Sequence, residues 1–248
     1  ELSGDIASIL AVSLRLQHRT FQTSFVELWS KEREANMQGG GVHGNVILSR
    51  YPVADVRSGI YKETPKVWTK DNQQPRKGGR GFLGQTIDTP FGNITVVVTQ
   101  LEKYATKDQR VLQFKELSRH FGNDTAPTKI HEHTKGYPII IGGDFNTWSY
   151  NINEDDKKKS EVVEALRWKK DIIPNMPGMS LEDPFPATAA TSYAEYKNTD
   201  ADKVDWLLID KRFEVTYQML AEEDEVFTDN FENRLSDHLW MYVDVSKS

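Results

Sequence analysis

The chain reads Ile139-Ile140-Ile141-Gly142-Gly143-Asp144-Phe145-Asn146-Thr147-Trp148 at the stretch that decides its fold. The apolar run, rich in β-branched residues, predicts a buried strand that ends at a Gly-Gly turn. Because side chains alternate along an extended chain, Asp144 and Asn146 lie on the same side of it. This pair suits a phosphate and a hard cation, since a carboxylate binds metal or a water proton and an amide donates to phosphoryl oxygen. The alternative is a strand followed by an Asx-rich turn.

Two later segments place similar side chains at strand ends. Lys203-Val204-Asp205-Trp206-Leu207-Leu208-Ile209-Asp210 is an apolar strand with one acid, Asp205, near its start. Leu235-Ser236-Asp237-His238-Leu239-Trp240-Met241-Tyr242-Val243 puts an Asp-His pair directly before a final apolar strand. Each cluster alone is usually structural. Three clusters of types that handle phosphate and magnesium favour a shared site.

Three earlier segments extend this pattern: Gly44-Asn45-Val46-Ile47-Leu48-Ser49-Arg50-Tyr51-Pro52, Gly78-Gly79-Arg80-Gly81-Phe82, and residues 95–113. With the three strand-end clusters, they resemble in order the motifs of the endonuclease/exonuclease/phosphatase superfamily. That superfamily includes deoxyribonuclease-like nucleases, abasic-site endonucleases, inositol-polyphosphate phosphatases, deadenylases and neutral sphingomyelinases. No single motif is specific, but six in the same order carry the resemblance.

The resemblance implies an α/β fold over residues 1–248, one domain built as a four-layer sandwich. Two mostly antiparallel β-sheets pack face to face with helices outside. Hairpin signals in both halves agree with this architecture, whereas the near-alternation of strands and helices alone would also fit a parallel doubly wound sheet. The sequence pattern predicts helices at 4–18, 107–120 and 159–169, and strands at 25–29, 45–49, 82–87, 94–99, 139–143, 205–210, 214–221 and 239–245. Residues 171–202 are expected to be rich in loops.

The activity that the resemblance implies is metal-assisted hydrolysis of a phosphate ester, with Mg²⁺ or Mn²⁺ as cofactor. Asp144 would orient and deprotonate the attacking water, and Asn146 would hold the water or a phosphoryl oxygen. Asp205 is expected to pair with His238 and fix its tautomer. His238 would then contact the phosphate or help to take a proton.

Two further positions complete the expected site. Asp237 is the best remaining metal ligand, beside Asp144. Arg80 lies in the basic segment Arg76-Lys77-Gly78-Gly79-Arg80, which can grip a phosphate, although a solvated loop with one structural Arg is an equally good interpretation. The aromatic residues beside the clusters, Trp148 and Trp206 among them, suit either a substrate cleft or the core.

Position 100 departs from the family pattern. The family's strand ends in Thr-His-Leu, and this chain has Thr99-Gln100-Leu101 instead. The family's histidine donates to a phosphoryl oxygen and helps to stabilise charge. Gln100 can donate a hydrogen bond but cannot carry a proton or a positive charge. A catalytically impaired relative that serves as a binding or scaffold protein is therefore the alternative function.

The start of the chain is the second departure. The family begins with a strand carrying an Asn and a strand ending in Gln-Glu, whose Glu binds the metal, and neither is visible here. Glu1 is one candidate for that Glu. Because a missing strand leaves a neighbour with unpaired backbone groups, we expect something to occupy its place, a second chain being one candidate.

Composition narrows the class of protein. Hydrophobic residues make up 38% and charged residues 27% of the 248 residues, as in ordinary globular domains, and no apolar run approaches the ~18 residues of a membrane span. The absence of cysteine excludes disulfides and thiolate metal sites but leaves the compartment open, secretion and the periplasm included. The net charge of −6 weakly disfavours a dedicated nucleic-acid binder. The substrate thus stays open between a nucleic-acid phosphodiester and a phospholipid or inositol phosphate.

Overall fold

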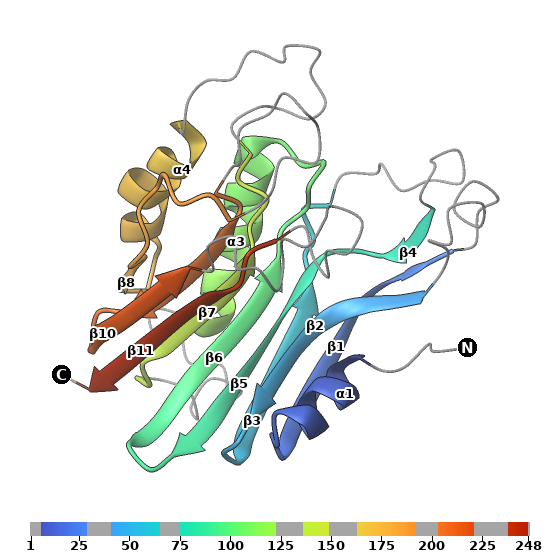
Figure 1. The fold of residues 1–248 in the computed structure, drawn as a ribbon. Helices are drawn as coiled ribbons and strands as arrows, with labels where there is room; N and C mark the ends of the chain where they lie inside the picture. The colour runs from blue at the N-terminus through green and yellow to red at the C-terminus, as the bar shows by residue number, and fades with distance from the viewer. Residues whose placement is uncertain are drawn as a thin grey trace, which may run out of the picture.

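The computed structural model describes residues 6–28, 41–64, 75–122, 136–148, 163–191, 203–220 and 238–247. Within these ranges the elements are α1 (Ile6–Ser13), β1 (His18–Glu27), β2 (Gly41–Ser49), β3 (Val53–Ile60), β4 (Arg76–Gly78), β5 (Gly81–Thr89), β6 (Gly92–Gln100), α3 (Lys107–Phe121), β7 (Ile139–Asp144), α4 (Val163–Arg167), the π-helical turn η1 (Trp168–Ile172), the 3₁₀ turn η2 (Ile173–Asn175), β8 (Leu181–Glu182), β9 (Asp205–Asp210), β10 (Phe213–Leu220) and β11 (Met241–Lys247). Figure 1 shows their arrangement.

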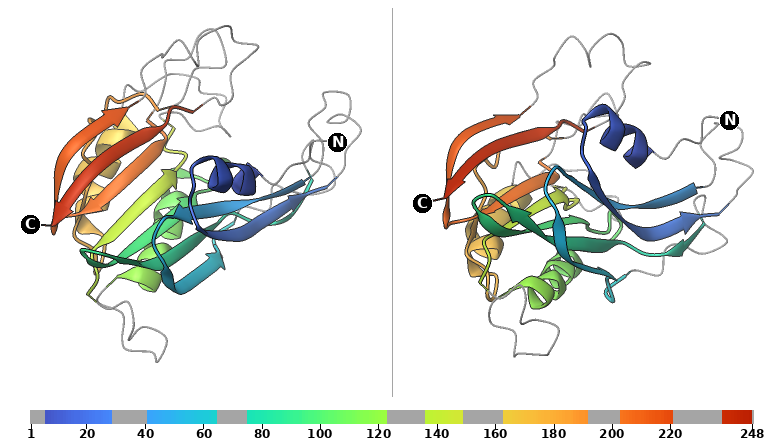
Figure 2. Two further views of the ribbon diagram at one scale, coloured as in Figure 1. Left: turned by 60° about the horizontal axis from the view of Figure 1, so that its bottom comes forward. Right: turned by 90° about the horizontal axis from the view of Figure 1, so that it is seen from below.

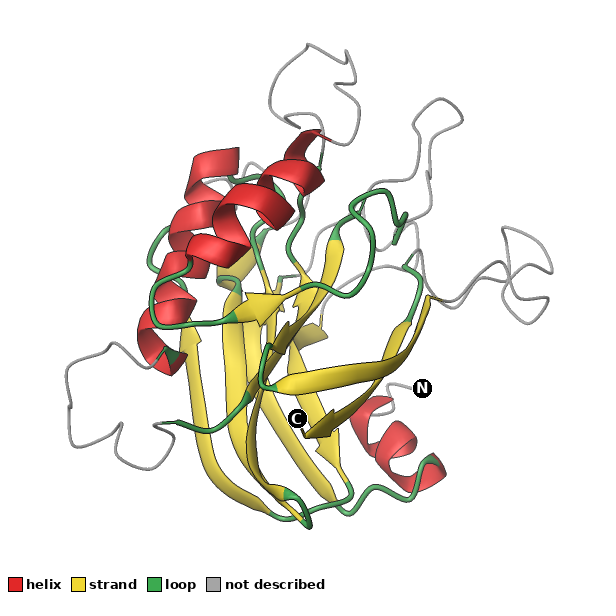
Figure 3. Ribbon diagram, turned by 90° about the vertical axis from the view of Figure 1, so that its left-hand side faces the viewer, coloured by secondary structure: helices red, strands yellow, loops and turns green. Residues whose placement is uncertain are grey.

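The strands form two layers. A six-stranded sheet has the order β3-β5-β6-β7-β9-β8, in which only β6 and β7 run parallel. The second layer contains the antiparallel sheet β2-β1-β4 and the hairpin β10-β11, both on one face of the six-stranded sheet (Figure 2). Helices α3 and α4 cover the opposite face, and α1 lies outside the second layer (Figure 3). The predicted α/β sandwich is confirmed.

The main core lies between the six-stranded sheet and the helices. It gathers buried side chains from both: Phe82, Val97, Ile139, Ile141, Trp206 and Leu208 of the sheet, Phe114 and Leu117 of α3, and Trp168 of η1. The rings of Phe114, Phe145 and Trp168 pack within 5.2–5.5 Å of one another. Since fully buried aromatic side chains contribute most to core packing, this cluster fixes the strands that carry the polar ends. Trp206, one of the aromatic residues left open by the sequence, belongs to this core.

The other face of the central strands is less completely covered. Along β6, buried and half-buried side chains alternate, with Val97 buried and Val96 and Val98 half-buried. Alternation puts Val96 and Val98 on the face away from Val97 and the helices, toward the second layer. Among the described strands, that layer is divided into two sheets that share no ladder.

Helix α3 begins with a complete capping box. The Thr106 hydroxyl accepts from the Gln109 backbone N–H at 3.2 Å, and the Gln109 side chain accepts from the Thr106 N–H at 2.9 Å. Two N-terminal N–H groups are thereby satisfied, which explains where the helix starts. The predicted helix at 107–120 is confirmed, with one more residue at its end.

The N-terminal boundaries differ from the prediction. The helix ends at Ser13 rather than at residue 18, because Arg15 adopts a left-handed φ of 54° and Leu16 N–H bonds back to Ala11 O at 2.8 Å, as in a Schellman cap. Strand β1 then starts at His18, seven residues before the predicted strand. Its inward positions include Gln22 and Ser24, which are polar, so hydrophobic alternation did not reveal it.

Among the described residues, no helix combines the length and the apolar character needed to cross a membrane.

Candidate functional site

The site lies where three central strands end side by side. The parallel pairing of β6 and β7 puts Gln100 opposite Asp144, and the antiparallel pairing of β7 and β9 puts Asp144 opposite Asp205. Strands β6 and β7 finish at this edge and β9 starts there. The register therefore brings together three polar residues that are far apart in the sequence, as the strand-end clusters predicted.

Asp144 is the most heavily hydrogen-bonded carboxylate of the cluster. Its Oδ1 accepts from the Asn146 backbone N–H at 2.8 Å, and its Oδ2 accepts from Gln100 Nε2 and Asn146 Nδ2, each at 3.0 Å. These bonds fix the orientation of the carboxylate. They occupy three of its roughly four lone-pair positions, so about one remains for a water or a cation.

Asn146 is held by an uncommon backbone conformation. Its φ is 50°, a left-handed value that Asn tolerates better than most residues. The side chain is buried, and its Nδ2 also donates to Leu101 O at 2.8 Å. Its Oδ1 accepts from the Trp148 indole N–H at 2.9 Å. Trp148 therefore orients the amide, a role that the sequence left open between cleft and core.

The expected pairing of Asp205 and His238 is present. His238 Nδ1 lies 2.7 Å from Asp205 Oδ2, with side chains 31% and 15% exposed respectively. A carboxylate at Nδ1 favours the tautomer in which Nδ1 carries the proton. The pair is partly buried but open enough to be reached from solvent.

Arg80 reaches the cluster through Gln100. One guanidinium nitrogen donates to Gln100 Oε1, and its Nε lies 3.9 Å from Glu102 Oε2. The guanidinium also stands over the Phe25 ring, 4.9 Å from its centroid. Arg80 is thus a largely buried cation behind Gln100, and these contacts also fit the structural arginine considered from the sequence.

The electrostatics of the cluster favour proton uptake by Asp144. Burial raises the pKa of the Asp144 carboxyl, and the nearby Asp205 charge raises it further, while His238 and the bonds from Gln100 and Asn146 lower it less. A carboxylate with a raised pKa is a stronger base than an ordinary aspartate. Burial also lowers the pKa of Arg80, against the opposing effect of Glu102 and Asp144.

The described residues do not by themselves form a cation cage. Within the described ranges there is no group of three or more His, Cys, Asp or Glu side chains able to hold a metal. Most lone pairs of the Asp144 carboxylate accept hydrogen bonds from amide N–H groups, and the Asp205 carboxylate is bound to His238. Asp237, the ligand expected from the sequence, lies outside the described residues, as does Glu1.

Gly143 shapes the backbone immediately before Asp144. Its φ is 145°, and a Cβ added there would lie 1.8 Å from Thr99 O on the neighbouring strand. We expect Gly143→Ala to destabilise the protein by about 2–4 kcal/mol, because the strained φ and the backbone clash add. Chemical denaturation with urea measures this loss.

Gly142→Ala is the matched control for that variant. An added Cβ at Gly142 meets Leu207 Cδ1 at 3.5 Å and no backbone atom closer than 3.9 Å. Its stability should stay within about 1 kcal/mol of the parent chain. Equal losses for both variants would show that Gly143 is not specially constrained.

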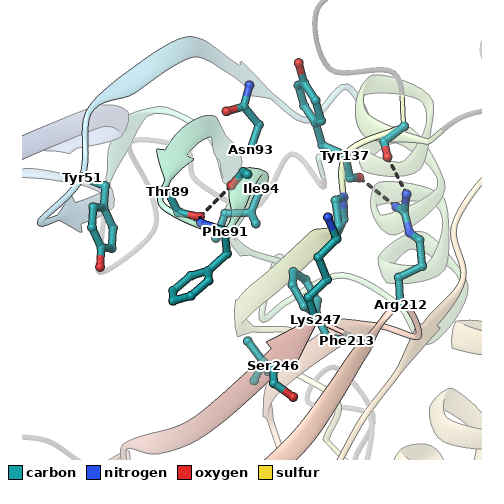
Figure 4. A pocket seen from close by; sticks show the side chains of 14 residues that line it. Tyr51, Thr89, Phe91, Asn93, Ile94, Tyr137, Arg212, Phe213, Ser246 and Lys247 are labelled. Carbon is teal, nitrogen blue, oxygen red and sulfur yellow. Dashed lines mark hydrogen bonds between the residues drawn. The ribbon is translucent and has the colours of Figure 1, made fainter.

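A separate cavity of about 630 Å³ lies at the other end of the same strands (Figure 4). It is bounded by the β5–β6 turn, the residues before β7 and the end of β11. Arg212, one of its charged lining residues, donates at 2.8 Å to Tyr137 O and at 2.6 Å to Asp210. Since β6 begins at this end and the polar cluster lies where β6 finishes, the cavity is separate from the polar cluster.

Thr147 is a buried member of the site region that sequence reasoning missed. Its hydroxyl donates to Lys203 O at 2.5 Å and accepts from the Trp206 indole N–H at 2.9 Å. It thus joins the loop after β7 to the start of β9. A lone Thr after Asn146 carries no sequence signal for this bond, because its partners lie more than fifty residues away.

The fold has well-defined relatives among solved structures. The endonuclease/exonuclease/phosphatase from Beutenbergia cavernae DSM 12333 matches at 18% identity and a TM-score of 0.63, over 98% of this chain and 58% of that one. ANGEL2, a 2',3'-cyclic phosphatase in complex with adenosine-2',3'-vanadate, matches at 16% identity and a TM-score of 0.56, over 98% of this chain and 77% of that one. D. rerio TDP2 complexed with single-strand DNA product matches at 12% identity and a TM-score of 0.55, over 98% and 90%.

These matches confirm the resemblance carried by the motifs, at the level of the fold. This chain spans less than two thirds of the length of the Beutenbergia protein. No family model matches the sequence, and no curated protein does either.

Proposed function

We propose that this chain, which has the fold of the endonuclease/exonuclease/phosphatase superfamily, hydrolyses phosphate esters by in-line attack of an activated water. The observation that carries the proposal is that two carboxylates in different environments lie next to each other at one sheet edge. Asp144 has a raised pKa and is held by amide donors, and Asp205 is bound to an imidazole. Paired titratable groups in different environments are the usual basis for dividing acid and base roles.

Asp144 takes the base role in this proposal. Its carboxylate accepts a proton from the water as the water oxygen attacks phosphorus and the bond to the leaving oxygen breaks. Asn146 and Gln100 keep the carboxylate in one orientation, so no reorganisation accompanies the attack.

His238 takes the phosphate role. With Nδ1–H bound to Asp205, the doubly protonated imidazolium form of His238 donates from Nε2–H to a phosphoryl oxygen and offsets the negative charge that develops there. Arg80 stands behind Gln100, on the flank of Asp144 opposite to Asp205 and His238, and we propose that its charge contributes to substrate binding. No covalent intermediate is needed.

We further propose that Mg²⁺ or Mn²⁺ assists the reaction, with Asp237 and Asp144 as ligands. This part rests on the sequence resemblance, since the described side chains do not complete a cation site. A divalent cation would supply charge stabilisation at the phosphoryl oxygens. We also propose that residues 1–248 form one domain.

A phosphodiester in nucleic acid is the substrate class that we favour. The solved relatives with adenosine-2',3'-vanadate and with single-strand DNA product support it, because the same fold holds nucleotide ligands in both. A phospholipid or inositol phosphate is the alternative substrate class.

The test is a panel of single-stranded DNA and RNA oligonucleotides, bis(p-nitrophenyl) phosphate, sphingomyelin and inositol phosphates, each with and without chelator. Turnover of at least one phosphodiester, abolished by chelator and restored by Mg²⁺ or Mn²⁺, is expected; robust turnover that survives chelation would overturn the metal-assisted mechanism.

Gln100→His should raise the turnover number. A neutral imidazole can accept from Arg80 and donate to Asp144, as the Gln100 amide does. On taking up a proton it gives up the bond from Arg80 and carries a positive charge that an amide cannot carry. We expect a gain of about 10-fold or more, since loss of general acid or electrostatic help costs ~10²–10⁴ in rate. Steady-state kinetics on the best panel substrate measure it.

Gln100→Glu provides the control for that variant, because it keeps the length of the side chain but places a second carboxylate beside Asp144. Its rate should fall. If neither substitution changes the rate, Gln100 is a tolerated position and does not limit catalysis.

The second candidate function is a catalytically impaired binding protein. The observation that favours it is the position of Gln100, an amide held between Arg80 and Asp144, at the place where the family's histidine acts. This candidate predicts binding of an oligonucleotide or phospholipid without turnover, even with Mg²⁺ or Mn²⁺ present.

A further inference from the structure

Asp205 lies in the six-stranded sheet and His238 in the segment that leads into the β10–β11 hairpin, so their pairing depends on how that segment is held against the sheet. Asp205 begins β9 of the six-stranded sheet, whereas His238 precedes β11 of the hairpin. β9 pairs with β7 and β8, and β11 pairs with β10. A 2.7 Å contact between side chains from separate segments requires the two backbones to be fixed relative to each other.

Thr191 contacts both backbones. Its hydroxyl oxygen accepts from the Asp205 backbone N–H at 2.8 Å and from the Val204 N–H at 2.9 Å. Its carbonyl oxygen accepts from the Leu239 N–H at 2.9 Å. Thr191 is thus hydrogen-bonded both to Asp205 and to Leu239, the residue next to His238. Its side chain is fully buried.

The chemistry of the hydroxyl suits this arrangement. A Thr oxygen has two lone pairs, and both are used by consecutive N–H groups at the start of β9. Val has nearly the same shape but no acceptor, so it would leave two buried or half-buried N–H groups without that partner. Ser keeps the acceptor and loses only a methyl group.

We propose that Thr191 is a positioning residue that sets the distance between Asp205 and His238. It touches no reacting atom in this assignment; it acts by holding the start of β9 and the His238 segment in one geometry. Its effect on turnover rests on the proposed hydrolase function, whereas its effect on the Asp205–His238 contact does not.

Neighbouring contacts keep the consequences of a change at Thr191 local. The residue before Val204 is anchored independently, because Lys203 O accepts from the Thr147 hydroxyl and Lys203 Nζ pairs with Asp183 at 3.2 Å, both side chains being fully buried. Loss of the Thr191 hydroxyl therefore removes one restraint on the Asp205 backbone, while the Lys203 contacts and the β7–β9 ladder still hold the strand.

The experiment compares Thr191→Val, Thr191→Ser and the parent chain, with Thr106→Val as a stability control. Thr106 caps α3 through its hydroxyl, so its loss weakens a helix end without touching the Asp205–His238 pair. The first readout is the proton signal of His238 Nδ1–H in ¹⁵N-labelled protein at constant pH and low temperature. The second is kcat and KM on whichever phosphodiester the chain turns over.

In Thr191→Val the His238 Nδ1–H signal should be lost or broadened while circular dichroism keeps the native signature. Thr191→Ser and Thr106→Val should keep the signal. Where turnover is measurable, Thr191→Val should lower kcat by about 100-fold with KM within about threefold, since misplacement of a reacting group by about 1 Å costs on this order. Thr191→Ser should recover most of that loss.

An unchanged His238 signal in a folded Thr191→Val protein would overturn the proposal, as would equal kcat losses in Thr191→Val and Thr106→Val. If the parent chain turns over no substrate, the proposed function fails, and the His238 signal still decides the role of Thr191. If Thr191→Val does not fold, the Thr191→Ser protein decides instead: it keeps the acceptor hydroxyl, so a folded Thr191→Ser protein that loses the His238 signal would count against positioning.

Discussion

Asp205→Asn is expected to lower phosphodiester hydrolysis by about 10²–10⁴-fold while leaving the fold intact. An Asn at this position can turn its amide N–H₂ toward His238 Nδ1, which then must accept, so the ring is held in its neutral form without the positive charge proposed to contact the phosphate. The negative charge that stabilises an imidazolium is lost as well. Steady-state kinetics and circular dichroism of the two proteins measure the effect.

Asp210→Asn is the matched control, because Asp210 stands at the opposite end of the same strand. Burial acts to raise the pKa of Asp210, but its bonds to Arg212 and Ile139 outweigh this and lower it. A depressed pKa means that Asp210 contributes stability above the pKa of the unfolded chain, and that this contribution is lost as pH falls through the folded pKa. Asp210→Asn should therefore lower the melting temperature and leave kcat unchanged. If Asp205→Asn instead loses stability and keeps activity, Asp205 is structural only.

Asp144→Asn is expected to have an effect of the same order, about 10²–10⁴-fold, since an amide cannot take a proton from water. The substitution keeps the size of the side chain but turns an acceptor of three amide donors into a group with one acceptor oxygen. Some loss of stability will accompany the loss of rate, so kinetics are compared at a temperature well below both melting transitions.

The pH dependence gives an independent check on Asp144. The base form is needed, and burial with the Asp205 charge raises its pKa, so the rate should fall as pH decreases through a pKa higher than that of an ordinary aspartate. The residual rate of Asp144→Asn should lack this acid limb. An acid limb that persists unchanged in the variant would assign the titration to another group.

The central strands could be predicted from the sequence because their patterns are unambiguous. β9 matches the predicted strand at 205–210, and β7 extends the predicted strand at 139–143 by one residue, since both are runs of branched apolar residues with a polar end. β3 was missed because it is an edge strand whose side chains are at most half-buried. The start of β1 was missed because its buried positions hold polar residues.

The site also contains residues that the sequence predicted and residues that it did not. The position of Asp144, Asn146 and Asp205 at strand ends predicted that they would lie close to His238. Side chains alternate along a strand, so the pattern shows which of them lie on the same side at the end of the sheet. The stacking of Arg80 on Phe25 and the hold of Trp148 on Asn146 depend on tertiary contacts that no local pattern encodes. Thr191 has no sequence signal either, since its partners lie in two other segments.

The most direct test of the proposed chemistry compares the parent chain with Asp144→Asn, purified in parallel, on a labelled single-stranded DNA oligonucleotide and on bis(p-nitrophenyl) phosphate with Mg²⁺ or Mn²⁺. Parallel purification matters because a contaminating nuclease would cleave the substrate in both samples alike. The proposal predicts cleavage by the parent chain, its loss on chelation, and a rate at least about 10²-fold lower for Asp144→Asn. Equal rates for the two proteins, or cleavage by neither of them on any phosphate ester, would contradict it.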